Sequence, residues 1–448
     1  MKKVAAIFKN KEIVDRLAFT IMILFVFRIG AAITVPGVTL NDFSFADNDA
    51  FGLMNLLGGG TLQSFSVFAL GVSPYITSSI IVQLLSMDVL PALTELSKQG
   101  QFGRKKMEMA TRYLTLLLGA VQAYGVIKTM ENSSYITIAD TTFWGYAYIV
   151  TIMLAGAMLV MWLGDQISTK GLGNGVSVII FAGIVISLPL QISNAYTQWL
   201  SNRLGHGTAE ILKGALQFGV YILAFLLIIS FITFVEMSKR KIPVQHAGKS
   251  GGGQKYSQAS FLPIKINSAG VIPVIFASSI MMAPSVIASF ISSDAANAEW
   301  LKIFNSSDTV TMPWFNSQTW EMPWGLLIYL TLIVLFTFFY SKLQINPEKM
   351  AENFQKNGSY IPGVRPGNET ERYVGKVLNR VTAIGALSLA FIAALPIVLV
   401  LLKIVPDQSL ALGGTGLIIV VGVAIEMNNQ IDGLLAGKSF EEVSNGGR

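Results

Sequence analysis

Ten apolar stretches of membrane-spanning length follow one another along this sequence, separated by more polar connections. A transmembrane helix needs about 20 consecutive, mostly apolar residues to cross the hydrocarbon core of a bilayer. The pattern therefore predicts an all-α polytopic membrane protein. The predicted spans are residues 17–36, 65–87, 110–130, 145–164, 175–193, 213–235, 266–291, 324–341, 381–402 and 409–426.

Residues 51–64 form a further apolar segment, which glycines interrupt and which is too short to cross the bilayer before the next span begins. Irregular backbone persists at membrane depth only where protein covers it or where it lines a water-filled cavity. We therefore expect a re-entrant or half-inserted element beside an internal vestibule. An interfacial helix that lies flat on the membrane is the alternative.

Lysine and arginine residues are distributed unequally between the two sides of the predicted bundle. Because adjacent spans alternate in direction, ten spans place both termini on the same side. The tails and loops on that side hold 26 of the 32 Lys and Arg residues, and Arg28 lies within the first span. By the positive-inside rule, both termini are expected to be cytoplasmic. The opposite loops hold only Lys128, Arg203, Lys213, Lys302 and Lys403.

Two of the cytoplasmic loops, residues 236–265 and 342–380, are long and basic. They are candidate docking platforms, although ordinary solvated connectors can have the same composition. Five spans in each half permit an inverted repeat, because an odd number of spans reverses the orientation of the second half. The expected division is an N-terminal half at 1–195 that contains segment 51–64, a C-terminal half at 196–429 that contains both long loops, and a cytoplasmic tail at 430–448.

The composition agrees with a membrane protein and argues against several kinds of site. Hydrophobic residues make up 52% of the chain and charged residues 13%, with a mean hydropathy of +0.57. An average soluble domain has roughly a quarter of its residues charged. Cysteine is absent and only two histidines occur, so disulfides, cysteine nucleophiles and metal clusters are not expected. With no catalytic or nucleotide-binding motif, we expect no enzyme activity and no cofactor.

Arg28 is the one ionisable residue in the middle of a predicted span. It could contact lipid headgroups or another helix, but snorkelling to the interface is the favoured interpretation. Ion-coupled carriers usually place Asp or Glu at this depth, so the sequence favours a passive pore. An inverted-repeat secondary transporter is the alternative, and it would need a polar pocket at mid-bilayer. Gln83 and Asn267 are polar residues within spans, where hydrogen bonds across helices are expected.

A series of short motifs runs in order along nearly the whole chain. They are Phe27-Arg28-Ile29-Gly30, Phe68-Ala69-Leu70-Gly71 with Pro74-Tyr75-Ile76, Met161-Trp162-Leu163-Gly164-Asp165-Gln166-Ile167, Gly171-Leu172-Gly173-Asn174-Gly175, Phe181-Ala182-Gly183-Ile184-Val185, Ala269-Gly270-Val271-Ile272-Pro273, Ile361-Pro362-Gly363-Val364-Arg365-Pro366-Gly367 and Gly413-Gly414-Thr415. Together these motifs resemble the SecY family, the channel subunits of bacterial protein export.

The resemblance implies ten transmembrane helices in two inverted five-helix halves, a clamshell around an hourglass pore, with a short re-entrant plug helix near 51–64. It also implies a function: a channel that translocates unfolded secretory proteins across the cytoplasmic membrane and releases membrane-protein helices sideways into it. A narrow apolar constriction excludes water and ions by dewetting when it is closed. By motif position, the pore ring is Val72, Ile76, Ile180, Ile275 and Ile419, and the plug includes Asn55, Leu56, Leu57, Gly58 and Gly59.

The resemblance further implies a lateral gate between the second and seventh spans, where signal sequences bind, with Gln83 and Asn267 in its polar seam. It places docking sites for a SecA-type ATPase and for the ribosome on the two long loops, at Lys255 and Arg365. The basic pair expected in the first loop reads Gln254-Lys255 here, so attraction to RNA phosphates is expected to be weaker. The other expected partners are SecE-like and SecG-like small membrane subunits, unfolded preproteins and the lipid bilayer of the bacterial cytoplasmic membrane.

Overall fold

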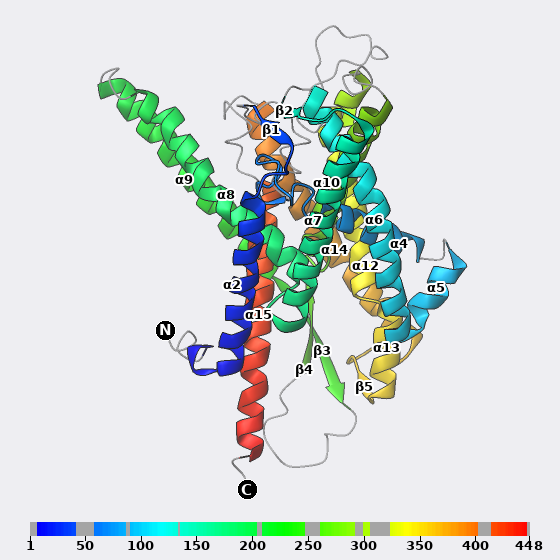
Figure 1. Ribbon diagram of the computed structural model, residues 1–448. Coiled ribbons are helices and arrows are strands. Elements are labelled where there is room, and N and C mark those ends of the chain that lie inside the picture. Colours follow the sequence, from blue (N-terminus) through cyan, green and yellow to red (C-terminus); the bar gives the residue numbers. More distant parts are fainter. Residues whose placement is uncertain are drawn as a thin grey trace, which may run out of the picture.

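The computed structural model describes residues 7–41, 58–86, 90–132, 135–203, 208–246, 260–291, 299–304, 323–401 and 414–445. This part of the chain is mainly helical, with two small sheets (Figure 1). The helices are α2 (Lys11–Ala32), α4 (Ser73–Leu85), α5 (Pro91–Lys98), α6 (Gly100–Asn132), α7 (Phe143–Lys170), α8 (Gly175–Trp199), α9 (Thr208–Met237), α10 (Ile272–Ile291), α12 (Trp324–Gln344), α13 (Pro347–Lys356), α14 (Asn368–Leu401) and α15 (Gly414–Asn445), with short 3-10 turns at Ser201–Arg203 and Glu299–Phe304.

Each of the ten predicted spans overlaps one of the described helices: α2, α4, α6, α7, α8, α9, α10, α12, α14 and α15. By length and composition, six of them are apolar enough to cross a membrane, namely α7, α8, α9, α12, α14 and α15. Helix α4 and the apolar start of α10 are shorter, and α2 and α6 contain charged residues such as Arg28 and Lys128. The chain is a multi-pass helical membrane protein.

Two helices begin later than the sequence predicts. The predicted second span starts at residue 65, but α4 begins at Ser73, because Phe65 and Gly71 have φ angles of +39° and +53° that no α-helix allows. The predicted seventh span starts at residue 266, but α10 begins at Ile272, just after Gly270 with φ +66°. The predicted helix starts at 65 and 266 were therefore wrong. The turns place irregular backbone next to both helices.

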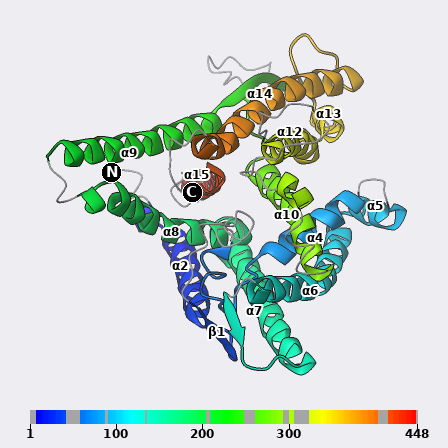
Figure 2. The same ribbon diagram turned by 90° about the horizontal axis from the view of Figure 1, so that it is seen from above.

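The helices form two groups that meet along two seams. In the first group α6 lies between α4 and α7, and α8 lies against α7; in the second, α12 lies between α10 and α14, and α15 contacts α9 and α14. Across the groups, α8 packs on α15, and α10 packs on α4 and α6 (Figure 2). The expected boundary at residue 195 stays a prediction, and α8 runs on to Trp199.

Two small antiparallel sheets lie at opposite ends of the bundle (Figure 1). At one end, β1 (Val38–Leu40) pairs with β2 (Ile136–Ile138) and joins the connection after α2 to the α6–α7 connection. At the other end, β3 (Lys239–His246) lies between β4 (Ser260–Lys265) and β5 (Ser359–Tyr360). The second sheet joins the two long loops that the sequence suggested as docking platforms.

Candidate functional site

The five residues expected to form a pore ring lie in one apolar cluster between the two groups of helices. Val72 is the residue before α4, and Ile76 lies in the first turn of that helix; Ile180, Ile275 and Ile419 come from α8, α10 and α15. Ile76 is half-buried, and the other four side chains are at most 7% exposed. Each group contributes two of the four helices, so the cluster lies where the groups meet.

The cluster is chemically suited to exclude water. Its buried members are aliphatic or aromatic. They include Phe27 and Phe68, whose rings stack with 5.7 Å between their centroids. Gly30 permits this stack, because a Cβ built there would lie 2.1 Å from the ring of Phe68. An apolar waist without charged or hydrogen-bonding groups offers a permeating ion nothing to replace its hydration shell. We call the five residues Val72, Ile76, Ile180, Ile275 and Ile419 the waist.

The predicted plug is only partly within the described residues. Asn55, Leu56 and Leu57 lie outside them, whereas Gly58 and Gly59 are described and buried. The Thr61 hydroxyl donates a 2.9 Å hydrogen bond to the carbonyl of Gly58, and Gly59 lies against Gly183 of α8. The segment after Gly58 is therefore folded into the protein, next to the waist.

Both residues proposed for the lateral gate are hydrogen-bonded across elements, but to different partners. The Gln83 amide oxygen on α4 accepts a 3.0 Å hydrogen bond from the Tyr340 hydroxyl on α12. The Asn267 amide, just before α10, donates to Glu236 at the end of α9 and, at 3.1 Å, to the carbonyl of Gly270. Among the described contacts, no hydrogen bond joins Gln83 to Asn267.

An aromatic cluster fills the seam where α4, α10 and α12 meet. Phe276 of α10 packs edge-on against Tyr340, with 4.6 Å between ring centroids, and lies 5.6 Å from Phe336. Ile80 of α4 is buried in the same cluster, together with Ala269. The Tyr340–Gln83 hydrogen bond thus joins the two groups of helices through an otherwise apolar seam, which we call the aromatic seam.

The sequence did not single out Tyr340 or Glu236. Tyr340 follows a run of aromatic residues in α12, and nothing in that run distinguishes a seam residue from one that faces lipid. Glu236 is 6% exposed, and its carboxylate accepts the hydrogen bond from the Asn267 amide. Its position after a long apolar run was the one available signal.

The two expected docking residues belong to the two long loops, residues 236–265 and 342–380. Lys255 is outside the described residues. Arg365 is exposed, its backbone N–H donates to Glu369 at 3.3 Å, and its carbonyl accepts from Thr370 at 2.9 Å. Both loops share one apolar core, so Arg365 lies on a folded platform. This core, which we call the platform core, contains Ile242, Ile264, Ile361, Val374, Leu378 and Val381.

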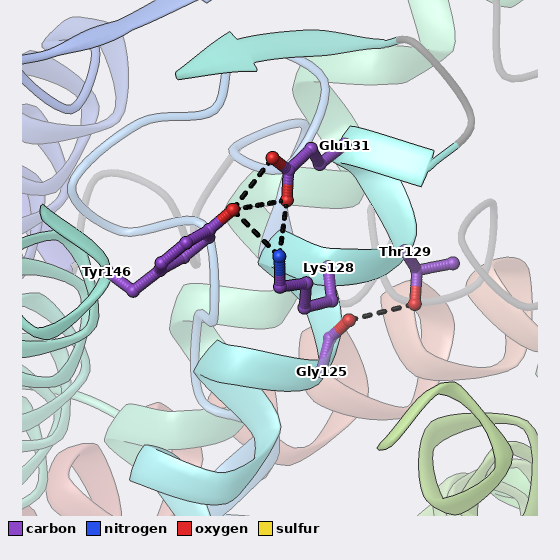
Figure 3. A network of polar contacts seen from close by, with 5 residues as sticks. All are labelled: Gly125, Lys128, Thr129, Glu131 and Tyr146. Carbon is purple, nitrogen blue, oxygen red and sulfur yellow. Dashed lines mark hydrogen bonds and ion pairs between the residues drawn. The ribbon is translucent and has the colours of Figure 1, made fainter. Parts of the chain in front are cut away.

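A polar network joins the end of α6 to the start of α7 (Figure 3). It lies near β2, at the end of the bundle opposite the sheet of β3, β4 and β5 (Figure 1). The Lys128 ammonium donates to Glu131 at 2.9 Å and to the Tyr146 hydroxyl at 2.7 Å, and that hydroxyl donates to Glu131 at 2.7 Å. Partial burial raises the pKa of Glu131, but the hydrogen bonds from Lys128 and Tyr146 and the Lys128 charge outweigh it and lower the pKa below its ordinary value. Glu131 therefore balances one of the few cations predicted on the external side.

Arg28 is exposed on the outer surface of α2. This position agrees with its favoured interpretation, a side chain that reaches along the bundle surface toward the interface. Within the described ranges, no group of three or more His, Cys, Asp or Glu side chains could hold a metal ion.

Taken together, the helical bundle, the apolar waist between its groups and the glycine segment beside that waist define a membrane protein of the channel class. The SecY family model matches residues 66–428, and the chain belongs to the SecY family. A protein translocase subunit SecY of Lactococcus lactis subsp. lactis is 45% identical over 436 residues, which cover 97% of this chain and 95% of the relative.

Solved structures support the same fold. A structure described as a protein-conducting channel has a TM-score of 0.65 at 16% identity, covering 93% of this chain and 91% of that one. Sec61 in a canine ribosome–channel complex from the endoplasmic reticulum has a TM-score of 0.61, with the same identity and coverage. The fold is thus ten transmembrane helices in two five-helix halves, and the comparisons support the channel hypothesis rather than the secondary-transporter alternative.

Proposed function

We propose that this chain is the central subunit of a protein-conducting channel, which passes unfolded secretory proteins across the cytoplasmic membrane and releases apolar helices sideways into lipid. The observation that carries the proposal is the waist. Four helices, two from each half, bring aliphatic side chains to one point, where they can surround an extended chain without binding it specifically.

The mechanism follows from the two seams between the halves. With the halves together, the waist blocks ions, and Gly58 and Gly59 lie beside it. Separation of α4 from α10 and α12 would open the aromatic seam to lipid. A signal sequence is an apolar helix, and burial of its surface contributes about 25 cal/mol per Å². It stabilises the open state only by its differential affinity for that state.

The channel makes and breaks no covalent bonds in this proposal, so a partner supplies the energy. SecE-like and SecG-like membrane subunits complete the channel, and a SecA-type ATPase or a translating ribosome docks on the cytoplasmic platform through the surface near Lys255 and Arg365. The shared platform core supports this assignment, because it makes one folded surface from two loops. Both termini are cytoplasmic, which places the platform on the same side as the motor.

Reconstitution tests the function directly. The chain is placed in proteoliposomes with its small membrane subunits, a SecA-type ATPase and ATP, and a signal-bearing precursor is added outside. We expect the precursor to become protected from protease, whereas the same precursor without its signal stays accessible. Equal protection of both, or of neither, would contradict the proposal. Replacement of Arg365 by Glu should reduce motor-dependent protection, because it reverses an exposed charge on the platform.

A further inference from the structure

Two glycines of different elements touch beside the waist. Gly59 has φ +75°, and a Cβ built on it would lie 2.7 Å from the Cα of Gly183 in α8. A Cβ built on Gly183 would lie 2.3 Å from the Cα of Gly59 and 3.0 Å from its nitrogen. Ordinary van der Waals contacts of a Cβ atom begin near 3.4 Å. The two backbones are therefore so close that both residues must be glycine.

A second contact of the same kind lies nearby. A Cβ on Gly71, which has φ +53°, would lie 3.0 Å from the Cα of Gly58. Gly71 immediately precedes Val72 of the waist, and Gly183 lies one helical turn beyond Ile180 of the waist. Residues Gly58–Gly59 thus rest on two backbone positions, each next to a waist residue.

We propose that Gly183 is a positioning residue that seats the plug and so keeps the resting channel closed. The proposal deepens the proposed function and rests on it. The contact between Gly59 and Gly183, which we call the seat, leaves no room for a side chain on either residue. Any side chain at Gly183 must therefore displace Gly59 by about 1 Å or more. Closure depends on this close fit of one backbone against the other.

Gly183→Ala perturbs the contact with Gly59 without weakening α8. Gly183 is in the interior of α8, where Ala is a better helix former than Gly, so the helix itself gains from the change. Gly59→Ala would mix two effects, because a side chain at φ +75° strains the backbone whatever surrounds it. Gly219→Ala in α9 is the matched control, because that helical glycine has nothing within 4 Å of a built Cβ.

The experiment measures resting ion flux through proteoliposomes that contain wild-type channel, Gly183→Ala, Gly219→Ala, a deletion of residues 54–61, or that deletion combined with Gly183→Ala. We expect Gly183→Ala to raise the flux on the order of ten-fold, as overpacking of a tight contact shifts the seated population. Gly219→Ala should behave as wild type, and Gly183→Ala should add nothing once the plug is deleted.

A wild-type flux for Gly183→Ala would overturn the proposal, and so would an equal increase in the deletion background, which would place the effect in the bundle rather than at the seat. Export of a signal-bearing precursor is measured in the same vesicles. Loss of export by the wild-type channel would contradict the proposed function, whereas the comparison of fluxes would still decide the role of Gly183.

Discussion

The hydrogen bond between Tyr340 and Gln83 should help to set the threshold for opening the lateral gate. It joins α12 to α4 at 3.0 Å across the aromatic seam, and Tyr340 is 6% exposed. Tyr340→Phe removes the hydroxyl but leaves the ring, so the contact with Phe276 remains. Side-chain hydrogen bonds within membrane bundles contribute about 0.6 kcal/mol on average and up to about 1.7 kcal/mol.

A loss of that size shifts the balance between closed and open gate roughly three-fold to almost twenty-fold. Under the proposed mechanism a strong signal sequence drives opening by itself, so the effect should be visible with a precursor whose signal has a shortened apolar core. We expect Tyr340→Phe to increase the rate at which this weak precursor becomes protease-protected, relative to the intact precursor, by about three-fold. The same shift is expected for Gln83→Leu.

The double variant decides whether the bond itself is responsible. If the bond acts as described, Tyr340→Phe and Gln83→Leu together should change the ratio no more than either change alone. Ser341→Ala is the matched control, because the Ser341 hydroxyl pairs with Thr382 at 2.6 Å inside the second half and spans no seam. Additive effects of the two variants, or an equal effect of Ser341→Ala, would refute the reasoning.

Three further predictions concern other parts of the molecule. Ile180→Asn should raise resting ion conductance in planar bilayers several-fold, because it puts a polar group into the waist; an unchanged conductance would count against the waist. Ile242→Ala should destabilise the platform core by about 2–4 kcal/mol and speed proteolysis of the loops, whereas Ala at the half-exposed Phe261 should not. Glu131→Gln should cost less than about 1 kcal/mol of stability. Since the folded-state pKa of Glu131 is lowered, its contribution is present above the ordinary carboxyl pKa and disappears as the pH falls through the lowered value, which thermal unfolding from about pH 6 to pH 3 can follow.

The sequence was enough to predict the helical bundle, because a bilayer leaves a spanning chain few options. Each apolar run of about 20 residues must satisfy its own backbone, so length and hydropathy locate the spans. Helix starts were less predictable. Gly71 and Gly270 lie within apolar runs, and only the fold shows that their backbone leaves the helical region.

The waist could be named only through the family resemblance, since nothing about an isoleucine in an apolar helix tells which neighbour it faces. Ile180 and Ile275 are 95 residues apart, and their shared cluster depends on how the two halves meet. The hydrogen-bond partners of the polar residues within the spans were harder still to predict. Gln83 and Asn267 were expected to be bonded across helices, but Tyr340 and Glu236 could not be identified as the partners from a single sequence.

The three-stranded sheet that joins the two long loops has a mechanical consequence. Strand β3 follows directly from α9, and β4 leads within seven residues into α10, while β5 ties the other long loop to the same strands. A load applied to either loop is therefore divided between both by the sheet, and a connection of only six residues, 266–271, passes it on to the first turn of α10. Under the proposed function, a partner that binds either loop would therefore pull on α10, one of the helices of the proposed lateral gate.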